Sequence, residues 1–426
     1  MVRLAIEGGE PIRKNPLPIE ADVIGEEEIN AVLEVLKAKR LRRAEIAEEY
    51  EAALAKYFGV KHALAVANGT VSMHAILAAL DVGPGDEVIT TPYTFIATAS
   101  VILMQNAIPV FADIDPEYLT IDPADIERKI TDRTKGIMPV SITGQPPDMG
   151  SIMEIAEAHD LWVVEDAAQS PGATYKDKLI GTIGIASSFS TISGKIIATG
   201  EGGFILTNDD ELYEKIWSYH NFARKRELGW ASKYFWGIPC TNYRITEIQC
   251  AIGLAQLKKL DKFLEIRRRN AEYLTKGIKD IEGIEPPKEA PWGKRVYYYY
   301  VIRLDREKLG VSLLQFAKAL SAEGVYDYHY TTTTRVPVPC HLQEIFTKKI
   351  GYGKTKCPFE CPLYGRKIEY KKGQLPNAER ACEEVLWLLE PHPLLTKEDL
   401  DDVIAALEKV CNEFVKRTQR GEKIRI

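Results

Sequence analysis

Short apolar runs alternate with helical patterns between residues 60 and 207. Several runs are apolar on consecutive positions, which is typical of strands buried on both faces, and most segments between them are long enough for crossover helices. The pattern therefore predicts an α/β layered domain. Its seven predicted strands are Ala63–Val66, Glu87–Thr91, Val110–Ala112, Gly136–Val140, Trp162–Glu165, Ala186–Ser190 and Gly203–Thr207.

A helical pattern follows the first predicted strand. Apolar residues from Met73 to Leu80 fall at i, i+3, i+4 and i+7, and the polar turn Asn68–Thr70 precedes them. We therefore expect a helix to begin beside the carboxyl end of that strand. A capping-box pattern at Thr246 predicts a second, longer helix.

The second half of the chain predicts a smaller α+β domain. Val296–Leu304 has the pattern of a strand, Leu313–Glu323 that of a helix, and Thr396 precedes a final amphipathic helix. We divide the chain into a large α/β domain, residues 1–260, and a small C-terminal domain, residues 261–426. A Pro- and Gly-rich irregular stretch, residues 336–376, is expected within the small domain.

Composition and charge exclude several classes of function. The 426 residues carry 55 Lys and Arg against 61 Asp and Glu, a formal charge of −6, so we expect no nucleic-acid partner. Only three consecutive apolar residues precede Glu7, too few for a secretory leader, and Pro92 interrupts the longest mostly apolar stretch, residues 88–104. We expect a cytoplasmic protein without a membrane span.

The seven cysteines are too few for a disulfide scaffold and are expected to be reduced thiols. Cys357 and Cys361, near Cys340-His341, form the one arrangement that resembles a metal site. Structural zinc sites usually repeat such a pair, and no second pair follows here. The sequence therefore favours loop thiols and no metal.

The start of the first predicted helix is a candidate anion site. Asn68-Gly-Thr-Val71 places unpaired backbone N–H groups and the positive end of the helix dipole beside a strand's carboxyl end, which favours a phosphate. The alternative is an ordinary helix cap, with Thr70 following a turn glycine.

Two carboxylates, Glu165 and Asp166, end the fifth predicted strand. Open α/β sheets bind ligands beyond the carboxyl ends of their strands, and strand alternation points only one of the two side chains into a given crevice. The alternative is a cap or a loop salt bridge.

Lys195 lies between a hydroxyl-rich strand and a glycine-rich turn. Burial disfavours a charged lysine, which lowers its pKa and makes the amine a usable nucleophile or base. The alternative is a lysine that extends from a strand end into water.

Together the three candidates are the parts that pyridoxal phosphate requires. The lysine forms a Schiff base with the aldehyde, the helix N-terminus holds the phosphate, and the carboxylate keeps the pyridine nitrogen protonated. An opposite charge at about 4 Å contributes about 4 kcal/mol at an effective dielectric of about 20, or about three pKa units. That is enough to keep the ring nitrogen charged at neutral pH.

The sequence resembles the DegT/StrS-like sugar aminotransferases, which are pyridoxal-phosphate enzymes of the aspartate aminotransferase fold, type I. This resemblance implies a mostly parallel seven-stranded sheet flanked by helices, with a smaller α+β domain. It runs through nearly the whole chain, in an ordered series of motifs: Gly8–Pro11, Ala67–Thr70, Gly83–Val88, Pro92–Phe95, Phe111–Asp115, Glu165–Gln169, Ser190–Gly203 and Asn242–Glu247.

The resemblance also implies roles for single residues. Lys195 would be the Schiff-base lysine, and Asp166 rather than Glu165 would face the pyridine nitrogen. Gln169 would lie near the phenolic oxygen of the ring, and Phe95 would stack on its face. The phosphate contacts would come from Thr70, Val71 and Ser190, and from Asn242 of the partner subunit in a homodimer whose subunits share the active site.

The predicted activity is transamination. An amino group would move from glutamate or glutamine to a ketone on a sugar nucleotide or a cyclitol, in two half-reactions with ping-pong kinetics. Tyr364 and the Tyr- and Pro-rich region around it resemble the cyclitol branch of the family.

Four alternatives remain. Dehydratases of the same family have histidine in place of the lysine, which Lys195 argues against. A pyridoxal-phosphate-binding regulator of transcription would need a helix-turn-helix segment and a basic surface, and a catalytically inactive scaffold would have a blocked pocket. A nicotinamide dehydrogenase would need Gly-x-Gly-x-x-Gly, where this chain has Asn68–Met73.

Overall fold

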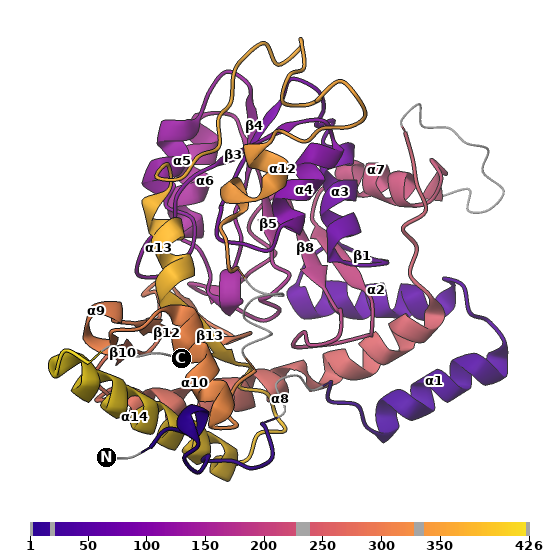
Figure 1. The fold of residues 1–426 in the computed structure, drawn as a ribbon. Helices are drawn as coiled ribbons and strands as arrows, with labels where there is room; N and C mark the ends of the chain where they lie inside the picture. The colour runs from indigo at the N-terminus through magenta and orange to yellow at the C-terminus, as the bar shows by residue number, and fades with distance from the viewer. Residues whose placement is uncertain (1–2, 18–21, 227–238, 328–335, 423–426) are drawn as a thin grey trace.

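The computed structural model describes residues 3–17, 22–226, 239–327 and 336–422 (Figure 1). All seven predicted strands form, and they join in one sheet of order β1-β9-β8-β5-β4-β2-β3. The antiparallel strand is β9, which pairs with β1 and β8, and the remaining pairs are parallel. The strands are β1 His62–Val66, β2 Glu87–Thr90, β3 Ile108–Phe111, β4 Thr134–Met138, β5 Trp162–Asp166, β8 Ala186–Ser190 and β9 Gly203–Thr207.

Helices cover both faces of this sheet, because side chains from alternate strand positions feed two separate cores. Ala63 and Ala65 of β1 belong to a core with α2, α6 and α8, whereas Leu64 and Val66 belong to one with α3, α4 and α7 (Figure 1). The helices of this part are α1 Glu26–Ala38, α2 Glu45–Phe58, α3 Gly69–Ala79, α4 Ala97–Met104, α5 Pro123–Lys129, α6 Met149–Ala158 and α7 Asp210–His220.

The helix predicted at Thr246 is α8, Glu247–Ile278, which connects the two predicted domains. Thr246 forms the expected capping box with Gln249. Leu260 and Leu264 pack in the core of the large sheet, whereas Ala271 and Leu274 pack in the core of the C-terminal part. The division proposed at residues 260 and 261 thus falls inside a continuous helix that both cores share.

A three-stranded sheet of order β10-β12-β13 forms the centre of the C-terminal part, and α10 and α14 pack on one of its faces. The predicted strand at Val296 begins only at Tyr300, because Tyr297 has a positive φ of 53° that extended pairing does not allow. The elements are β10 Ile284–Glu285, β11 Gly293–Lys294, β12 Tyr300–Leu304, α9 Arg306–Leu309, α10 Leu313–Ala322, α12 Glu344–Thr347, α13 Pro376–Glu384, β13 Val385–Leu389 and α14 Lys397–Gln419. A small second sheet joins β11 to β6 Thr174–Tyr175 and β7 Lys178–Leu179.

The stretch 336–376 does not lie within the C-terminal domain alone, as predicted, but also covers the edge strand β3 of the large sheet. The Tyr370 hydroxyl donates to the Pro109 carbonyl at 2.8 Å, and the rings of Phe346 and Tyr370 pack on Phe111. Covering an edge strand removes unpaired backbone groups from solvent, which local sequence periodicity does not reveal. None of the helices among the described residues has the length and apolar character of a membrane span.

Candidate active site

One cavity of about 490 Å³ lies where β5 and β8 end beside the start of α3. Seven of the eight residues singled out from the sequence line it: Thr70, Val71, Phe95, Asp166, Gln169, Ser190 and Lys195. The fold therefore brings together side chains from five separate segments. The eighth residue, Asn242, lies outside this cavity and pairs with Asn221.

The N-terminus of α3 forms one wall of the cavity. Asn68, not Thr70, is the capping residue, and its Oδ1 accepts a hydrogen bond from the Val71 amide at 3.0 Å. The first amides of a helix have no intrahelical acceptor, and the first two residues of α3, Gly69 and Thr70, line the cavity. A Cβ on Gly69 would lie 2.9 Å from Cβ of Ser190, so the close approach of helix and strand requires glycine. This wall suits a phosphate.

Asp166 is 5% exposed at the end of β5 and faces the cavity. Its Oδ2 accepts from the Thr98 hydroxyl at 2.8 Å, and its Oδ1 accepts from the Ala168 amide at 3.2 Å. Burial raises the pKa of this carboxyl, while the Thr98 hydroxyl, the Ala168 amide and the charge of Lys195 act in the opposite direction. A buried carboxylate with two fixed donors is held ready for a cationic partner.

Glu165 points to the opposite face, as strand alternation requires. Its carboxylate accepts hydrogen bonds from the amides of Gly181 at 2.7 Å, Ile183 at 2.7 Å and Gly184 at 2.8 Å. Glu165 therefore orders the turn before β8 and has no part in the cavity. The two adjacent carboxylates therefore lie on opposite faces of the strand.

Lys195 reaches the cavity from the turn after β8. Its side chain is partly accessible from the cavity, yet the amine is desolvated, and burial lowers the pKa of Lys195 to about 8 against the opposing charges of Asp166 and Glu390. Nζ lies 4.3 Å from the centre of the Tyr298 ring, at cation–π distance. An amine with this pKa is partly neutral near physiological pH and is able to act as nucleophile or base.

Two further predicted residues complete the walls. Gln169 Oε1 accepts a hydrogen bond from the Thr143 amide at 2.6 Å, so the NH₂ end of its side chain is the end left to face the cavity. Phe95 lines the cavity, and 55% of its surface is exposed, which is high for an aromatic residue. Its ring is therefore available for stacking on a ligand.

The residues of the site that local sequence patterns do not reveal include Thr98, Tyr298 and Trp387. Thr98 is hidden in the apolar helix α4, and Tyr298 and Trp387 come from the C-terminal part, far along the chain. The run of four tyrosines at 297–300 was a signal for aromatic lining, but nothing local connected it with Lys195.

No group of three or more potential metal ligands occurs within the ranges that the structure describes. The cavity instead offers a buried amine, a buried carboxylate and a helix N-terminus around one space. These are the groups that an aldehyde, a pyridine nitrogen and a phosphate require, so the residues fit pyridoxal phosphate.

The layered sheet and this set of residues define the class of protein: a pyridoxal-phosphate-dependent enzyme of the aspartate aminotransferase type, fold type I. The profile of the DegT/DnrJ/EryC1/StrS aminotransferase family matches residues 22–360. This chain belongs to that family, and it is a pyridoxal-phosphate-dependent aminotransferase.

Three similar proteins illustrate the relationship. A GDP-perosamine synthase of Caulobacter vibrioides is 39% identical over 85% of this chain and 89% of its own length. A putative L-glutamine:3-amino-2,3-dideoxy-scyllo-inosose aminotransferase of Streptoalloteichus tenebrarius is 36% identical over 96% of this chain and 97% of its own. The crystal structure of DesV from S. venezuelae, in complex with a ketimine intermediate, aligns with a TM-score of 0.77 at 30% identity over 92% of this chain and 95% of that one.

Proposed function

We propose that this aminotransferase moves an amino group from glutamate or glutamine to a ketone on a sugar nucleotide or a cyclitol. The observation that carries the proposal is the single cavity in which Lys195, Asp166 and the start of α3 meet. The names of two relatives support the acceptor class, since one concerns a GDP-linked sugar and the other an amino inosose. The second name also supports glutamine as donor.

We assign Lys195 as the catalytic base and acid. When bound, the cofactor supplies the electron sink and carries the amino group between donor and acceptor. A pKa of about 8 would let Lys195 take a proton from the donor's α-carbon in the first half-reaction and, in the second, deliver a proton to the acceptor carbon that receives the amino group. The ring of Tyr298, 4.3 Å from Nζ, orients the amine.

We assign the remaining cavity residues to binding. Asp166 would hold a proton on the pyridine nitrogen, with Thr98 and the Ala168 amide fixing its carboxylate. Gln169 would donate to the ring oxygen, and Phe95 would stack on the ring. Thr70, Val71 and Ser190 would contact the phosphate.

We further propose a homodimer in which Asn242 of each subunit completes the partner's phosphate site. The position of Asn242 outside its own cavity supports this assignment. Its Oδ1 accepts from the Arg244 amide at 3.3 Å, which fixes the loop that carries it.

Acceptor screening tests the proposed function. The enzyme is loaded with pyridoxamine phosphate and mixed with single ketones: nucleotide-linked keto sugars, inososes and linear 2-oxo acids. We expect the visible absorption band of the lysine-bound cofactor to return with a cyclic keto polyol, and Lys195→Met to show no band with any ketone. A response to linear 2-oxo acids alone would overturn the acceptor class.

A further inference from the structure

A fully buried arginine of the C-terminal part is linked to the cavity through one threonine. Arg295 is 3% exposed, and its Nη2 donates a hydrogen bond to Oγ1 of Thr143. The backbone N–H of Thr143 in turn donates to Oε1 of Gln169 at 2.6 Å, and Gln169 lines the cavity. The contacts therefore form one chain, Arg295 to Thr143 to Gln169.

Thr143 has a backbone conformation that threonine rarely adopts. Its φ is 55° and its ψ is 14°, and among the described residues it is the one β-branched residue with positive φ. The branched Cβ makes this left-handed conformation costly, so it persists only where the surroundings impose it. Such a conformation directs the Thr143 amide toward Gln169.

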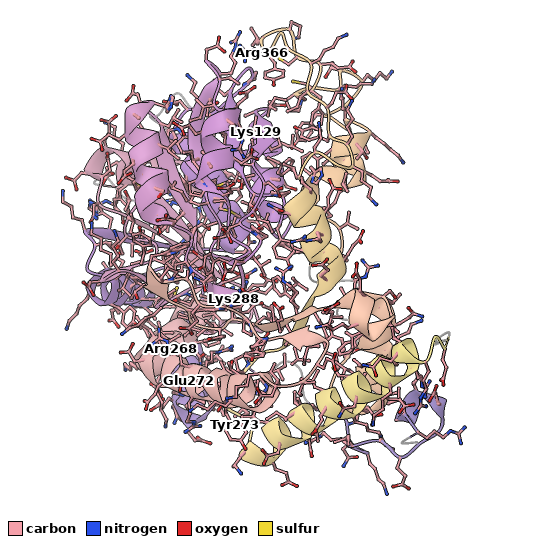
Figure 2. All side chains as sticks on the ribbon, turned by 90° about the vertical axis from the view of Figure 1, so that its left-hand side faces the viewer. Lys129, Arg268, Glu272, Tyr273, Lys288 and Arg366 are labelled. Carbon is pink, nitrogen blue, oxygen red and sulfur yellow. The ribbon has the colours of Figure 1, made fainter. Side chains whose placement is uncertain are left out.

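The turn that contains Thr143 is closed by its own backbone hydrogen bonds, from Gly144 to Ser141 at 3.2 Å and from Gln145 to Ile142 at 2.9 Å, and it also receives contacts from the segment around Arg295. Besides the bond from Arg295 to Thr143, the Val296 amide donates to the carbonyl of the next residue, Gly144, at 3.1 Å. Arg268, labelled on α8 in Figure 2, donates a hydrogen bond to the Arg295 carbonyl at 3.1 Å and so anchors this segment to α8.

Burial of the charged Arg295 side chain is unfavourable for the free energy of folding. Its guanidinium lies 5.0 Å from the Tyr297 ring, but it takes part in none of the ion pairs found in the described ranges, and within them its Nε has no hydrogen-bond acceptor. The charge of Glu289, which accepts a hydrogen bond from the Tyr297 hydroxyl, favours the cation without pairing with it directly. A buried cation without a directly bonded carboxylate contributes little to stability. A role in holding Thr143 accounts for its presence better than a role in stabilising the fold.

The direction of the Gln169 amide decides what it offers to a ligand. A glutamine side chain carries an acceptor and a donor at opposite corners, and the two are exchanged by a flip of the amide. The Thr143 N–H binds the oxygen, so the NH₂ group is the corner that faces the cavity. Loss of the Thr143 contact would let the amide rotate.

We infer that Arg295 is a positioning residue that, through Thr143, holds the Gln169 amide with its NH₂ group toward the ring oxygen of the cofactor. This inference rests on the proposed function, which places Gln169 beside that oxygen. It extends the site to an arginine outside the cavity wall, contributed by the C-terminal part of the chain.

The visible spectrum of the bound cofactor provides a direct readout. A donor to the ring oxygen stabilises its negative charge and lowers the pKa at which the visible band of the lysine-bound cofactor titrates. Gln169→Leu removes the donor and is expected to raise this pKa. Arg295→Met and Thr143→Val, which keeps the branched shape, should each raise it by about half a unit, a roughly threefold change in proton affinity.

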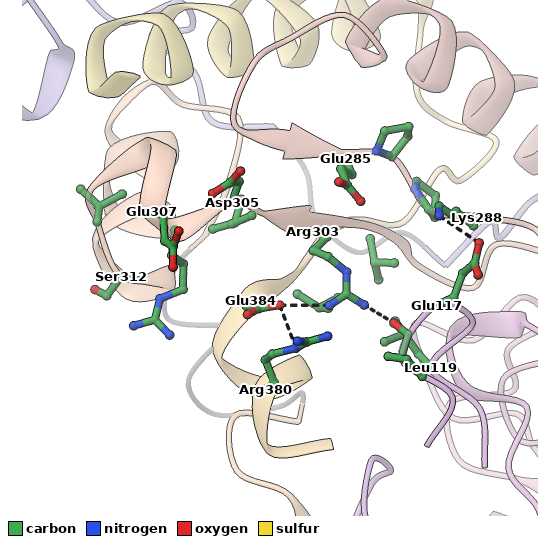
Figure 3. Close-up of a pocket in the computed structure, with 18 of the residues that line it drawn as sticks. Glu117, Leu119, Glu285, Lys288, Arg303, Asp305, Glu307, Ser312, Arg380 and Glu384 are labelled. Carbon is green, nitrogen blue, oxygen red and sulfur yellow. Dashed lines mark hydrogen bonds and ion pairs between the residues drawn. The ribbon is translucent and has the colours of Figure 1, made fainter. Parts of the chain in front are cut away.

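Two comparisons separate positioning from a general loss of structure. The double variant Arg295→Met with Thr143→Val should shift the pKa no further than the single variant with the larger shift, because both substitutions break the same hydrogen bond. Arg303→Met is the matched control. Arg303 also reaches from the C-terminal part to the large domain, where it donates to the Pro116 carbonyl, and it pairs with Glu384 at 3.1 Å (Figure 3). Arg303 does not line the cofactor cavity.

The outcomes distinguish this inference from the proposed function. If Gln169→Leu shifts the spectral pKa but Arg295→Met and Thr143→Val do not, or if their effects add, the inference is wrong and the proposed function stands. If Gln169→Leu itself has no effect, Gln169 does not face the ring oxygen, and both its proposed role and the inference fail. A shift in Arg303→Met equal to that in Arg295→Met would also overturn it.

Discussion

Adjacent side chains in this protein have different tasks because a strand places them on opposite faces. Asp166 faces the cavity and accepts two hydrogen bonds. Glu165 lies on the opposite face of the strand and accepts hydrogen bonds from three backbone amides. Both carboxyls are buried, and burial raises the pKa of each. Their chemistry differs only through the groups that each one meets.

Asp166→Asn is expected to lower kcat by about a thousandfold, because the lost charge is worth about three pKa units at the pyridine nitrogen. Glu165→Gln is the matched control. It should lower the free energy of unfolding by about 1–3 kcal/mol, since one amide oxygen replaces two carboxylate oxygens, with kcat of the folded enzyme little changed. Steady-state rates and denaturant unfolding of both variants test this, and equal losses of kcat would contradict it.

The buried amine of Lys195 predicts a pH dependence of stability in the cofactor-free chain. Because folding lowers the pKa of Lys195 to about 8, the unfolded chain binds more protons between about pH 8 and 10.5, so stability should rise with pH across this window. Lys195→Met removes the cost of the buried cation. We expect the variant to be more stable by about 3 kcal/mol at pH 7, from a shift of about 2.5 units.

Urea unfolding of the cofactor-free wild type and of Lys195→Met, at pH 7 and at pH 10.5, measures this difference. The advantage of the variant should shrink toward zero at the higher pH. An advantage that is the same at both values would show that packing, and not the charge of Lys195, is its cause.

At the scale of elements, the site depends on how α3 meets β8. Asn68 caps the helix, Gly69 allows the close approach to Ser190, and the Ser72 and Ser188 hydroxyls form a hydrogen bond across the contact. The capping pattern was readable from the sequence, although the cap is Asn68 and not Thr70. The contact with β8 was not readable, because more than a hundred residues separate the two elements.

Asn68→Ala should lower both stability and cofactor affinity. Loss of the cap is expected to lower the free energy of unfolding by about 1 kcal/mol. It also leaves the first turn of α3 less ordered, and with it the backbone amides that we propose to hold the phosphate. Asp209 caps α7 in the same way, accepting from the Leu212 amide at 2.8 Å, but it does not line the cavity. Asp209→Ala should therefore cost similar stability and leave the dissociation constant of the cofactor unchanged. Equal affinity losses in both variants would exclude a specific role for Asn68.

At the scale of the whole molecule, the cavity is closed by a part of the chain that the large sheet does not contain. Tyr298, Tyr299 and Trp387 form its walls from the C-terminal part, and α8 holds the two parts together through one helix. The proposed dimer would add Asn242 from a second chain. A complete site would then consist of residues from the large domain, from the C-terminal part and from the partner subunit.

Mixing two inactive variants tests the shared site. Lys195→Met lacks the amine, and Asn242→Asp places a negative charge beside the partner's phosphate. In a mixed dimer, one of the two sites has both native residues, so exchange of subunits should restore about a quarter of the wild-type activity. Size-exclusion chromatography of the mixture is the control for assembly. A mixture of dimers that exchange subunits but stay inactive would contradict the proposed role of Asn242.

The sequence alone determined the seven strands of the large sheet and the positions of the candidate groups at strand ends and at a helix start. Seven buried strands follow from runs of apolar residues, and Lys195, Asp166 and the start of α3 follow from their places at strand ends and a helix start. These are local patterns, because burial and capping depend on residues a few positions apart. The tertiary structure decided the strand order, the antiparallel β9, and the covering of β3 by residues 336–376. It also decided that Thr98, Tyr298 and Trp387 meet the lysine and the carboxylate, because contacts between distant segments depend on packing that no local spacing records.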